Sequence, residues 1–276
     1  MLDVKFGACE FTLPGCSIGS VKLAKEVGLA GLQLDLGSYE RGFLLSQKWI
    51  RDYYKEECDK YEIVIPSIAI VAFDNFGLRN PKGTEKGDMV YRIMDIAAEA
   101  AVDMKVEMIM VPSFVDGIIK TKEDMEITAK ALKYICRAVA SSGITVTTEN
   151  TLTIEDNKKL IALVDEENIT GFYDSENYWA SNGWDSPKVL EELINANLLY
   201  PEIHLKDGIG NKCSTKLLGE GDSDFYGTMA VLKKYNYSGW LHLENFYDRP
   251  PLNVLSPQNY IAILQKDFET VKNACK

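Results

Sequence analysis

The stretch GITVTTEN, residues 143–150, is an apolar and β-branched run that carries a carboxylate, Glu149, beside its C-terminal end. Three later runs share this pattern and carry Asp174, His204 and Glu244: ITGFYDSENYW (169–179), LLYPEIHLKDG (198–208) and SGWLHLENFY (238–247). The four residues follow one another at intervals of 25, 30 and 40 positions. A (β/α)8 barrel of about 250 residues has roughly 30 residues per strand-plus-helix unit, and its chemistry lies at the C-terminal strand ends. The runs therefore predict an α/β fold, a single (β/α)8 TIM barrel, with a site on its last four strands.

The rest of the chain alternates in the same way, as expected for strand-plus-helix units on a parallel sheet. The first four strands are expected at 4–11, 31–37, 63–73 and 106–114. Helices are expected at 17–28, 45–61, 84–104, 121–142, 153–166, 186–196, 223–236 and 256–274. Ser186-Pro187 and Ser256-Pro257 resemble capped helix starts. No linker interrupts the pattern, which predicts one domain over 1–276.

An open, doubly wound sheet is the competing fold. Such a sheet normally carries a GxGxxG fingerprint between an early strand and its helix. The pairs Gly208/Gly210 and Gly219/Gly221 do not form this fingerprint, and they lie late in the chain. The barrel is therefore the preferred interpretation.

Composition restricts the partners. The chain has 276 residues, 46% of them hydrophobic, which suffices for one large core, and a formal net charge of -11. An acidic chain lacks the clustered positive field that nucleic acids and anionic membranes require, so the expected partner is a small molecule. The N-terminal MLDVKFGACEF carries an acid where a signal peptide carries positive charge, and no apolar run approaches the length of about 18 residues needed for a membrane span. Six cysteines without a CxxC pair (Cys9, Cys16, Cys58, Cys136, Cys213 and Cys275) fit a reducing, cytoplasmic location.

The four strand-end residues form a complete ligand set for one divalent cation. Taken singly, Glu149 and Asp174 are more readily interpreted as solvated loop carboxylates, and His204 also fits a core histidine that is hydrogen-bonded to the backbone. Glu244 stands in an apolar strand, where an unpaired charge is costly to bury. Three carboxylates and one imidazole without a thiolate suit Mn²⁺, Co²⁺, Mg²⁺ or Zn²⁺. A structural ion-pair network is the alternative explanation.

The position of Glu149 and Glu244 on the first and last of the four strands predicts two bases on different sides of a central substrate. One glutamate would remove the proton α to a metal-bound carbonyl, and the other would return a proton to the enediolate. Return to the same carbon gives epimerisation, and return to the neighbouring carbon gives aldose–ketose isomerisation. A small neutral sugar or polyol-derived substrate suits the acidic site.

These residues resemble the xylose-isomerase-like TIM barrels, specifically the sugar phosphate isomerase/epimerase group with its ketose 3-epimerases, hydroxypyruvate isomerases and inosose dehydratases. The resemblance rests on the motifs TTEN, FYDSEN, IHLKD and HLEN, which contain Glu149, Asp174, His204 and Glu244. It implies that these four bind one metal ion, that the two glutamates are the acid–base pair, and that Glu155 is a substrate-site carboxylate. The stretch LGEGDSDF (218–225) resembles the family's glycine-rich loop.

Two departures from the family pattern bear on specificity. Asn177 stands where the family often has histidine, and it can hydrogen-bond a hydroxyl but cannot act as an imidazolium. An arginine found in some epimerases after the strand-seven histidine is missing, and Lys206 is expected either to supply that charge to the substrate or to form an ordinary ion pair.

Two further segments have two interpretations each. The polar segment 73–88 reads as a lid or as a disordered loop. Tyr178, Trp179 and Trp184 fit either the apolar face of a sugar, with Trp179 as a substrate contact, or a subunit contact in a homo-oligomer.

Three other functions compete with this interpretation. An inosose dehydratase-like lyase would use the same enolising step and then lose a β-hydroxyl. A non-catalytic, metal-dependent sugar-binding protein would use the same ligands without proton transfer. The related endonuclease IV branch needs many histidines, and this chain has only His204 and His242.

Overall fold

The computed structural model describes residues 2–15, 17–256, 259 and 261–276. Its main sheet is a closed barrel of eight parallel strands in the order β1-β10-β7-β6-β5-β4-β3-β2, so the predicted single TIM barrel fold is confirmed. By packing, the chain divides into two compact units. Unit 1 comprises Met1–Gln33, Glu57–Val64 and Tyr173–Lys276, and unit 2 comprises Leu34–Glu56 and Ile65–Phe172. Three elements have residues in both: β2 (Gly31–Asp35), β6 (Ile169–Asp174) and α2 (Lys48–Tyr61).

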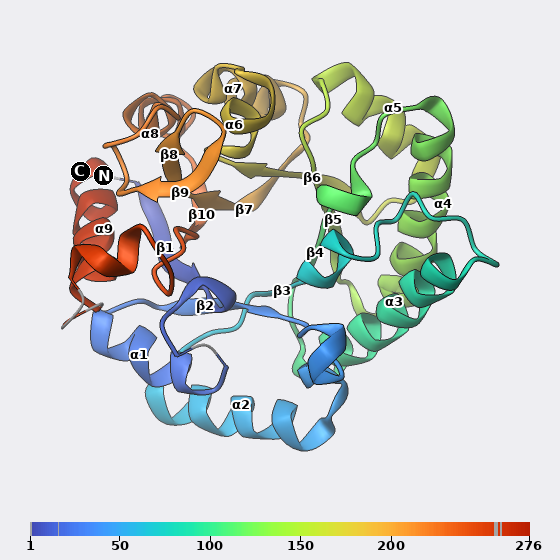
Figure 1. The fold of residues 1–276 in the computed structure, drawn as a ribbon, viewed down its shortest axis with the longest axis horizontal. Coiled ribbons are helices and arrows are strands. Elements are labelled where there is room, and N and C mark those ends of the chain that lie inside the picture. Colours follow the sequence, from blue (N-terminus) through green and yellow to red (C-terminus); the bar gives the residue numbers. More distant parts are fainter. Residues whose placement is uncertain (1, 16, 257–258, 260) are drawn as a thin grey trace. The chain divides into compact units, whose positions relative to one another are not determined.

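Unit 1 contains the first strand of the barrel and its last two. The strands are β1 (Asp3–Cys9), β7 (Leu199–Leu205) and β10 (Ser238–Leu243), with a small hairpin of β8 (Asp207–Ile209) and β9 (Lys212–Lys216). The helices are α1 (Gly19–Val27), α6 (Asn177–Asn182), α7 (Ser186–Asn195), α8 (Phe225–Lys234) and α9 (Ile261–Ala274), with 3-10 turns at Glu10–Thr12 and Leu252–Leu255. β10 lies between β1 and β7, with Gly7 level with His242, and His242 level with His204. Helices α7 and α8 pack side by side (Figure 1).

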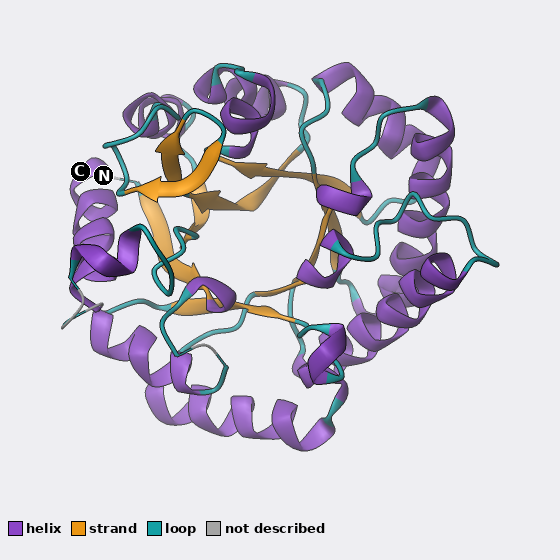
Figure 2. Cartoon of the chain, in the orientation of Figure 1, coloured by secondary structure: helices purple, strands orange, loops and turns teal. Residues whose placement is uncertain are grey.

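Unit 2 contains the middle strands and their helices. The strands are β3 (Ser67–Ala69), β4 (Met108–Pro112) and β5 (Thr145–Glu149), and the helices are α3 (Glu85–Met104), α4 (Lys122–Val139) and α5 (Ile154–Val164). Short 3-10 turns lie at Tyr39–Arg41, Leu44–Ser46, Val71–Asp74, Val115–Gly117 and Ala140–Ser142. Every residue of β4 is buried, as expected for a parallel strand covered on both faces. Helices α3, α4 and α5 pack one after another on the outer side of β4 and β5 (Figure 2).

Helix starts follow local capping chemistry. Thr121 and Asp124 form a reciprocal capping box at α4, and the hydroxyl of Thr153 accepts the amide of Asp156 at α5. The predicted start of the helix near residue 186 is correct, but the cap is Asp185, whose carboxylate accepts the Lys188 amide, and Ser186 is already helical. Pro257, in the other expected start, lies outside the described residues, as does Cys16. The other five cysteines are free thiols.

Three expected segments differ from the structure. The run 169–179 is not one strand, because the Asp174 carboxylate accepts the amides of Glu176 and Asn177 and turns the chain into the short helix α6. The run 63–73 forms only the three-residue strand β3 before a 3-10 turn. The segment after β7 forms the hairpin β8–β9, which the sequence pattern did not predict.

The polar segment 73–88 of unit 2 is tied to one carboxylate. The amide of Gly77, the side-chain amide of Asn80 and the ammonium of Lys86 all contact Asp116 Oδ2, at 3.2, 2.9 and 2.9 Å. The segment therefore has a defined conformation that depends on Asp116. Among the residues that the structure describes, no helix combines the length and the apolar character needed to cross a membrane.

Two glycines leave room for aromatic rings inside unit 1. A Cβ at Gly7 would lie 2.5 Å from the ring of His242, and one at Gly31 would lie 2.6 Å from the ring of Trp240. These two rings stack on each other, with centroids 5.5 Å apart. Glycine at these strand positions is therefore a packing requirement, because both rings are buried and a Cβ would approach them more closely than van der Waals contact allows.

We expect Gly7→Ala to destabilise the protein by about 1 to 3 kcal/mol, because the added methyl overpacks a buried ring. Gly19→Ala is the matched control, since no atom lies within 4 Å of its added Cβ and the residue begins a helix. The control should stay within about 1 kcal/mol of the wild type, in the stabilising direction. Urea denaturation measures both, and equal unfolding free energies for the two variants would contradict the packing argument.

Candidate metal centre

Three of the four predicted ligands meet in unit 1. Asp174 ends β6, His204 is the last residue but one of β7, and Glu244 follows the end of β10. Each offers one ligand atom, and these atoms lie within 4.8 Å of one another. All three side chains are buried, and His204 Nδ1 lies 3.2 Å from Glu244 Oε2. The predicted convergence of these three residues is therefore present.

Lys206 places a positive charge beside the two carboxylates. Its ammonium nitrogen lies 2.7 Å from Glu244 Oε2 and 3.3 Å from Asp174 Oδ2, and the lysine is buried. Burial by itself raises the pKa of Glu244, but the charges of His204 and Lys206 outweigh it and hold this pKa far below the usual value for a glutamate. Lys206 therefore forms a buried ion pair with the candidate ligands themselves. The carboxylate of the next residue, Asp207, accepts hydrogen bonds from a loop instead.

The remaining oxygens and nitrogens of the ligands are held by fixed donors and acceptors. Asp174 Oδ1 accepts the amides of Glu176 and Asn177 at 2.8 and 2.6 Å, so Oδ2 faces Lys206. His204 Nε2 lies 2.9 Å from Gln33 Oε1, so Nδ1 faces Glu244. Each ligand thus presents one defined atom to the cluster.

The donor set fits a divalent cation. Carboxylate oxygens and an imidazole nitrogen suit Mg²⁺, Mn²⁺, Co²⁺ and Zn²⁺. Atoms bound to one ion at about 2.1 Å stand roughly 3.0 to 3.4 Å apart, and the 3.2 Å between His204 Nδ1 and Glu244 Oε2 falls in this range. The Lys206 ammonium already satisfies a demand for positive charge at this point.

Cys9 lies within reach of the same centre. Its sulfur, His204 and Glu244 offer atoms within 4.8 Å of one another. Burial raises the pKa of the Cys9 thiol to about 12, and the thiol donates to Gln33 Oε1 at 3.8 Å. The Cys9 thiol therefore packs beside the centre, within reach of a cation held by His204 and Glu244.

Glu149, the fourth predicted ligand, ends β5 in unit 2. It is buried, and its backbone carbonyl accepts the amide of Ser113 at 2.8 Å. The next residue, Asn150, donates to Thr148 and Asn157 and so fixes the chain where the strand ends. Glu149 is therefore held at the C-terminal end of its strand, as the sequence predicted.

The predicted substrate contacts have different surroundings. Glu155 lies in the first turn of α5, where its exposed carboxylate pairs with Lys158 at 2.9 Å. Asn177 is buried at the start of α6, and Trp179, one turn into that helix, is half-buried.

Four buried polar residues of this region were missed by the sequence reasoning: Gln33, Glu176, Glu202 and His242. Burial raises the pKa of Glu176 to about 7 against the charge of Lys206, and its Oε2 accepts the Ser214 amide. Glu202 and His242 lie two positions before His204 and Glu244 on the same strands. Because residues two apart share one face of a strand, this alternation was the available signal.

The loop after β9 is organised by one carboxylate. Asp207 is fully buried and accepts the amides of Gly208, Gly219, Gly221 and Ser223, at 3.0, 2.9, 3.0 and 3.2 Å. The Ser223 hydroxyl donates to the same side chain at 2.8 Å. This glycine-containing loop therefore takes its shape from the residue that follows Lys206.

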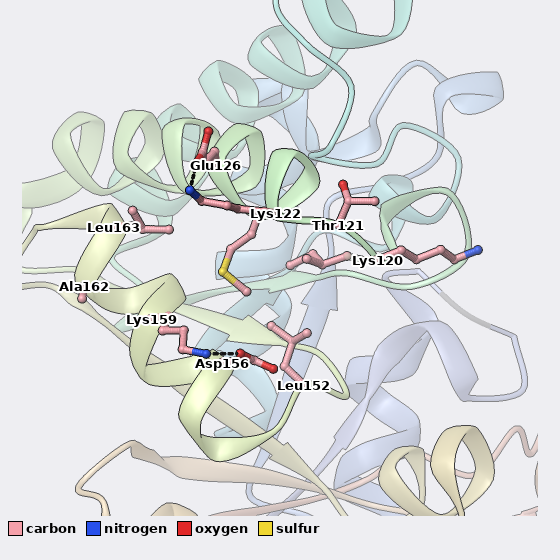
Figure 3. A pocket seen from close by; sticks show the side chains of 11 residues that line it. Lys120, Thr121, Lys122, Glu126, Leu152, Asp156, Lys159, Ala162 and Leu163 are labelled. Atoms are coloured by element: carbon pink, nitrogen blue, oxygen red, sulfur yellow. Dashed lines mark hydrogen bonds and ion pairs between the residues drawn. The ribbon is translucent and has the colours of Figure 1, made fainter.

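A separate cavity of about 660 Å³ lies in unit 2, between α4 and α5 (Figure 3). Its walls are the apolar Met125, Leu152 and Leu163, with lysines at the rim. Two of those lysines are ion-paired, Lys122 with Glu126 and Lys159 with Asp156. None of the predicted ligands lines this cavity.

A closed parallel barrel with buried carboxylates and an imidazole at its strand ends defines the class: a TIM barrel with a candidate cation centre. The family model described as xylose isomerase-like TIM barrel matches residues 21–267. The chain therefore belongs to the xylose isomerase-like TIM barrel family, and the resemblance drawn from its motifs is confirmed.

Individual relatives are distant in sequence. The 2-epi-5-epi-valiolone 7-phosphate 2-epimerase of Actinoplanes sp. is 24% identical over 235 residues, which cover 84% of this chain and 83% of the relative. The structure of D-psicose 3-epimerase from Clostridium cellulolyticum H10 with D-tagatose matches with a TM-score of 0.75 at 13% identity, covering 99% of each chain. The structure of IolI with a bound zinc atom matches with a TM-score of 0.75 at 16% identity, covering 97% of each chain. At these identities the structural matches establish the fold.

We expect Asp207→Ala to release the loop, because one carboxylate accepts four hydrogen bonds from it, and such charge-assisted bonds contribute about 1.5 to 3 kcal/mol each when measured singly. Hydrogen exchange followed by mass spectrometry should show faster exchange at 217–224. Asp222→Ala is the control, since this exposed carboxylate accepts only the Gly210 amide among its hydrogen bonds described here. Unchanged exchange in Asp207→Ala would refute the organising role.

Proposed function

We propose that this chain is a divalent-metal-dependent isomerase or epimerase of a small sugar or polyol-derived ketone. The observation that carries the proposal is the buried cluster of Asp174, His204 and Glu244, with Lys206 as its present positive partner. The names of its relatives support the reaction class, since one is a 2-epi-5-epi-valiolone 7-phosphate 2-epimerase and another a D-psicose 3-epimerase. The zinc atom in IolI supports the metal.

Glu149 is proposed as the fourth ligand. In unit 2, β5 pairs in parallel with β6, and Thr148 is level with Gly171. Glu149 is the next residue on β5, and Asp174 lies three positions beyond Gly171 on β6. Because parallel neighbours end at the same edge of a sheet, this register supports a shared ligand role for the two carboxylates.

The proposed reaction is proton transfer at carbon. A divalent cation held by Glu149, Asp174, His204 and Glu244 would polarise the substrate carbonyl and acidify the neighbouring C–H bond. One of the two glutamates removes that proton and the other returns one. The low pKa of Glu244 keeps it ionised and ready to accept a proton, although it also weakens this carboxylate as a base. Lys206 is proposed to donate a hydrogen bond to a substrate oxygen, and Asn177, Trp179 and Glu155 to contact the substrate.

Two alternatives use the same residues. A lyase would follow the proton abstraction with loss of a β-hydroxyl, as in an inosose dehydratase. A sugar-binding protein would hold the metal and the ligand without exchanging protons. The product of the reaction separates an epimerase, an isomerase and a lyase, and proton exchange separates all three from a binding protein.

We expect the protein to bind one equivalent of Mn²⁺ or Co²⁺, measured by isothermal titration calorimetry. Asp174→Asn and His204→Gln should each weaken metal binding by more than about 10-fold, because each removes a proposed ligand. The loss of a residue that only supports a ligand already lowers metal affinity by about 10-fold or more. Glu269→Gln is the control, because this carboxylate is exposed and pairs with Lys272. A wild-type protein that binds neither ion would contradict the proposal.

Glu149→Gln and Glu244→Gln should each reduce α-proton exchange by at least about 100-fold, since each removes a carboxylate that carries a proton. Exchange is followed by NMR in D₂O with ketoses, inososes and hydroxypyruvate as substrates, with circular dichroism to verify the fold. Chelation should abolish exchange in the wild type. If both variants retain α-proton exchange, the two-glutamate scheme is wrong. If the wild type binds metal but exchanges no proton, a binding protein is favoured.

A further inference from the structure

A chain of buried polar side chains in unit 1 contacts the imidazole of His204 at Nε2, the nitrogen that does not face Glu244. Its Nε2 lies 2.9 Å from Gln33 Oε1, on β2. Gln33 Nε2 donates to Glu202 Oε1 at 3.0 Å, and the same oxygen lies 3.3 Å from His242 Nε2. All four side chains are at most 1% exposed. A polar chain of this length inside a barrel needs a function that offsets its desolvation.

The direction of the hydrogen bonds follows from the amide of Gln33. Its nitrogen donates to a carboxylate, which only accepts, so its oxygen faces His204. A carbonyl oxygen also only accepts, and therefore Nε2 of His204 carries the proton. The other ring nitrogen, Nδ1, points to Glu244, 3.2 Å away.

The far end of the chain is rigid. The ring of His242 stacks on Trp240 and fills the space that Gly7 leaves open. Glu202 Oε1 therefore lies between the side-chain amide of Gln33 and this packed ring.

We propose that Gln33, held by Glu202 and His242, is a positioning residue that fixes the tautomer and the ring orientation of His204, so that Nδ1 is the atom offered to a divalent cation. This inference rests on the proposed function, since it assigns a task to Gln33 only where a metal binds. It makes β2, a strand with no ligand of its own, part of the metal centre. Metal-binding histidines generally need such an acceptor on the second nitrogen.

The tautomer is measured directly by ¹⁵N NMR of the imidazoles with Zn²⁺ bound. The chain has two histidines, so two rings are observed, and His242→Asn assigns them. In the wild type, the Nε2 of His204 should keep its proton while the resonance of Nδ1 shifts on adding Zn²⁺. A shift at Nε2 instead would overturn the inference, whatever happens in any variant of Gln33.

Affinity for Co²⁺ tests the supporting chain. Gln33→Met keeps the length of the side chain but removes its hydrogen bonds with His204, Glu202 and Cys9, and should weaken Co²⁺ binding by about 10- to 100-fold. The double variant Gln33→Glu with Glu202→Gln exchanges the amide and the carboxylate, so position 33 still accepts from His204 and from its partner. This exchange should restore most of the affinity.

The control is Tyr235→Phe, which removes two other hydrogen bonds of unit 1, from the Tyr235 hydroxyl to Glu191 Oε1 and Asn195 Oδ1. It should leave Co²⁺ affinity within about 2-fold of the wild type, because these partners lie on α7 and do not belong to the chain from Gln33 to His242. If the wild type binds no Co²⁺, Mn²⁺ or Zn²⁺, the proposed function fails and the inference falls with it. If the wild type binds Co²⁺ and Gln33→Met binds it equally well, the inference alone fails.

Discussion

The strand ends of unit 1 depend on one constraint, which is that buried carboxylates need a positive charge beside them. The ion pair between Lys206 and Glu244, with 2.7 Å between Nζ and Oε2, meets this need. Glu244 and Asp174 are carboxylates removed from water, and their burial is tolerable only beside positive charge. The ammonium of Lys206 meets that need in the structure, and a divalent cation would meet it with greater charge density. The ligand atoms are consequently oriented around a cation position: Asp174 by two amides at the start of α6, and His204 by Gln33.

Other carboxylates hold the surrounding loops without taking part in the cluster. Asp207 gathers the amides of its loop, and Asp267 of α9 accepts the Leu218 amide, the Asn245 side chain and the Tyr247 hydroxyl. Burial raises the pKa of Asp267 to about 6, against these three donors. Asn245 follows Glu244 directly, so this network fixes the backbone where the ligand leaves β10. The backbone around the centre is thus held by hydrogen bonds to buried carboxylates, and these bonds do not involve a metal.

The sequence predicts the strands that carry the ligands because each ends in an acid or an imidazole, and it predicts helix starts where a hydroxyl or carboxylate caps them. It fails where one side chain redirects the backbone, as Asp174 does when it turns 175–177 into α6. It also fails at Gln33, Glu202 and His242, because a strand pattern shows which residues share a face but not what lies opposite. Glu155 is the opposite case, because the family resemblance implies a role that its surroundings alone do not indicate. It lies on α5, where its exposed carboxylate pairs with Lys158.

Strands β7 and β10 each carry one glutamate and one histidine two positions apart, in opposite order. Glu202 contacts His242 and His204 contacts Glu244, and each contact reaches two residues beyond the register partner on β10. The two pairs therefore have the same composition and the same offset in register, but His204 approaches its glutamate through Nδ1 and His242 through Nε2. The neighbours of each pair, and not its residue types, therefore distinguish the two. The His204–Glu244 pair lies beside Asp174 and Lys206, whereas the Glu202–His242 pair packs against Trp240.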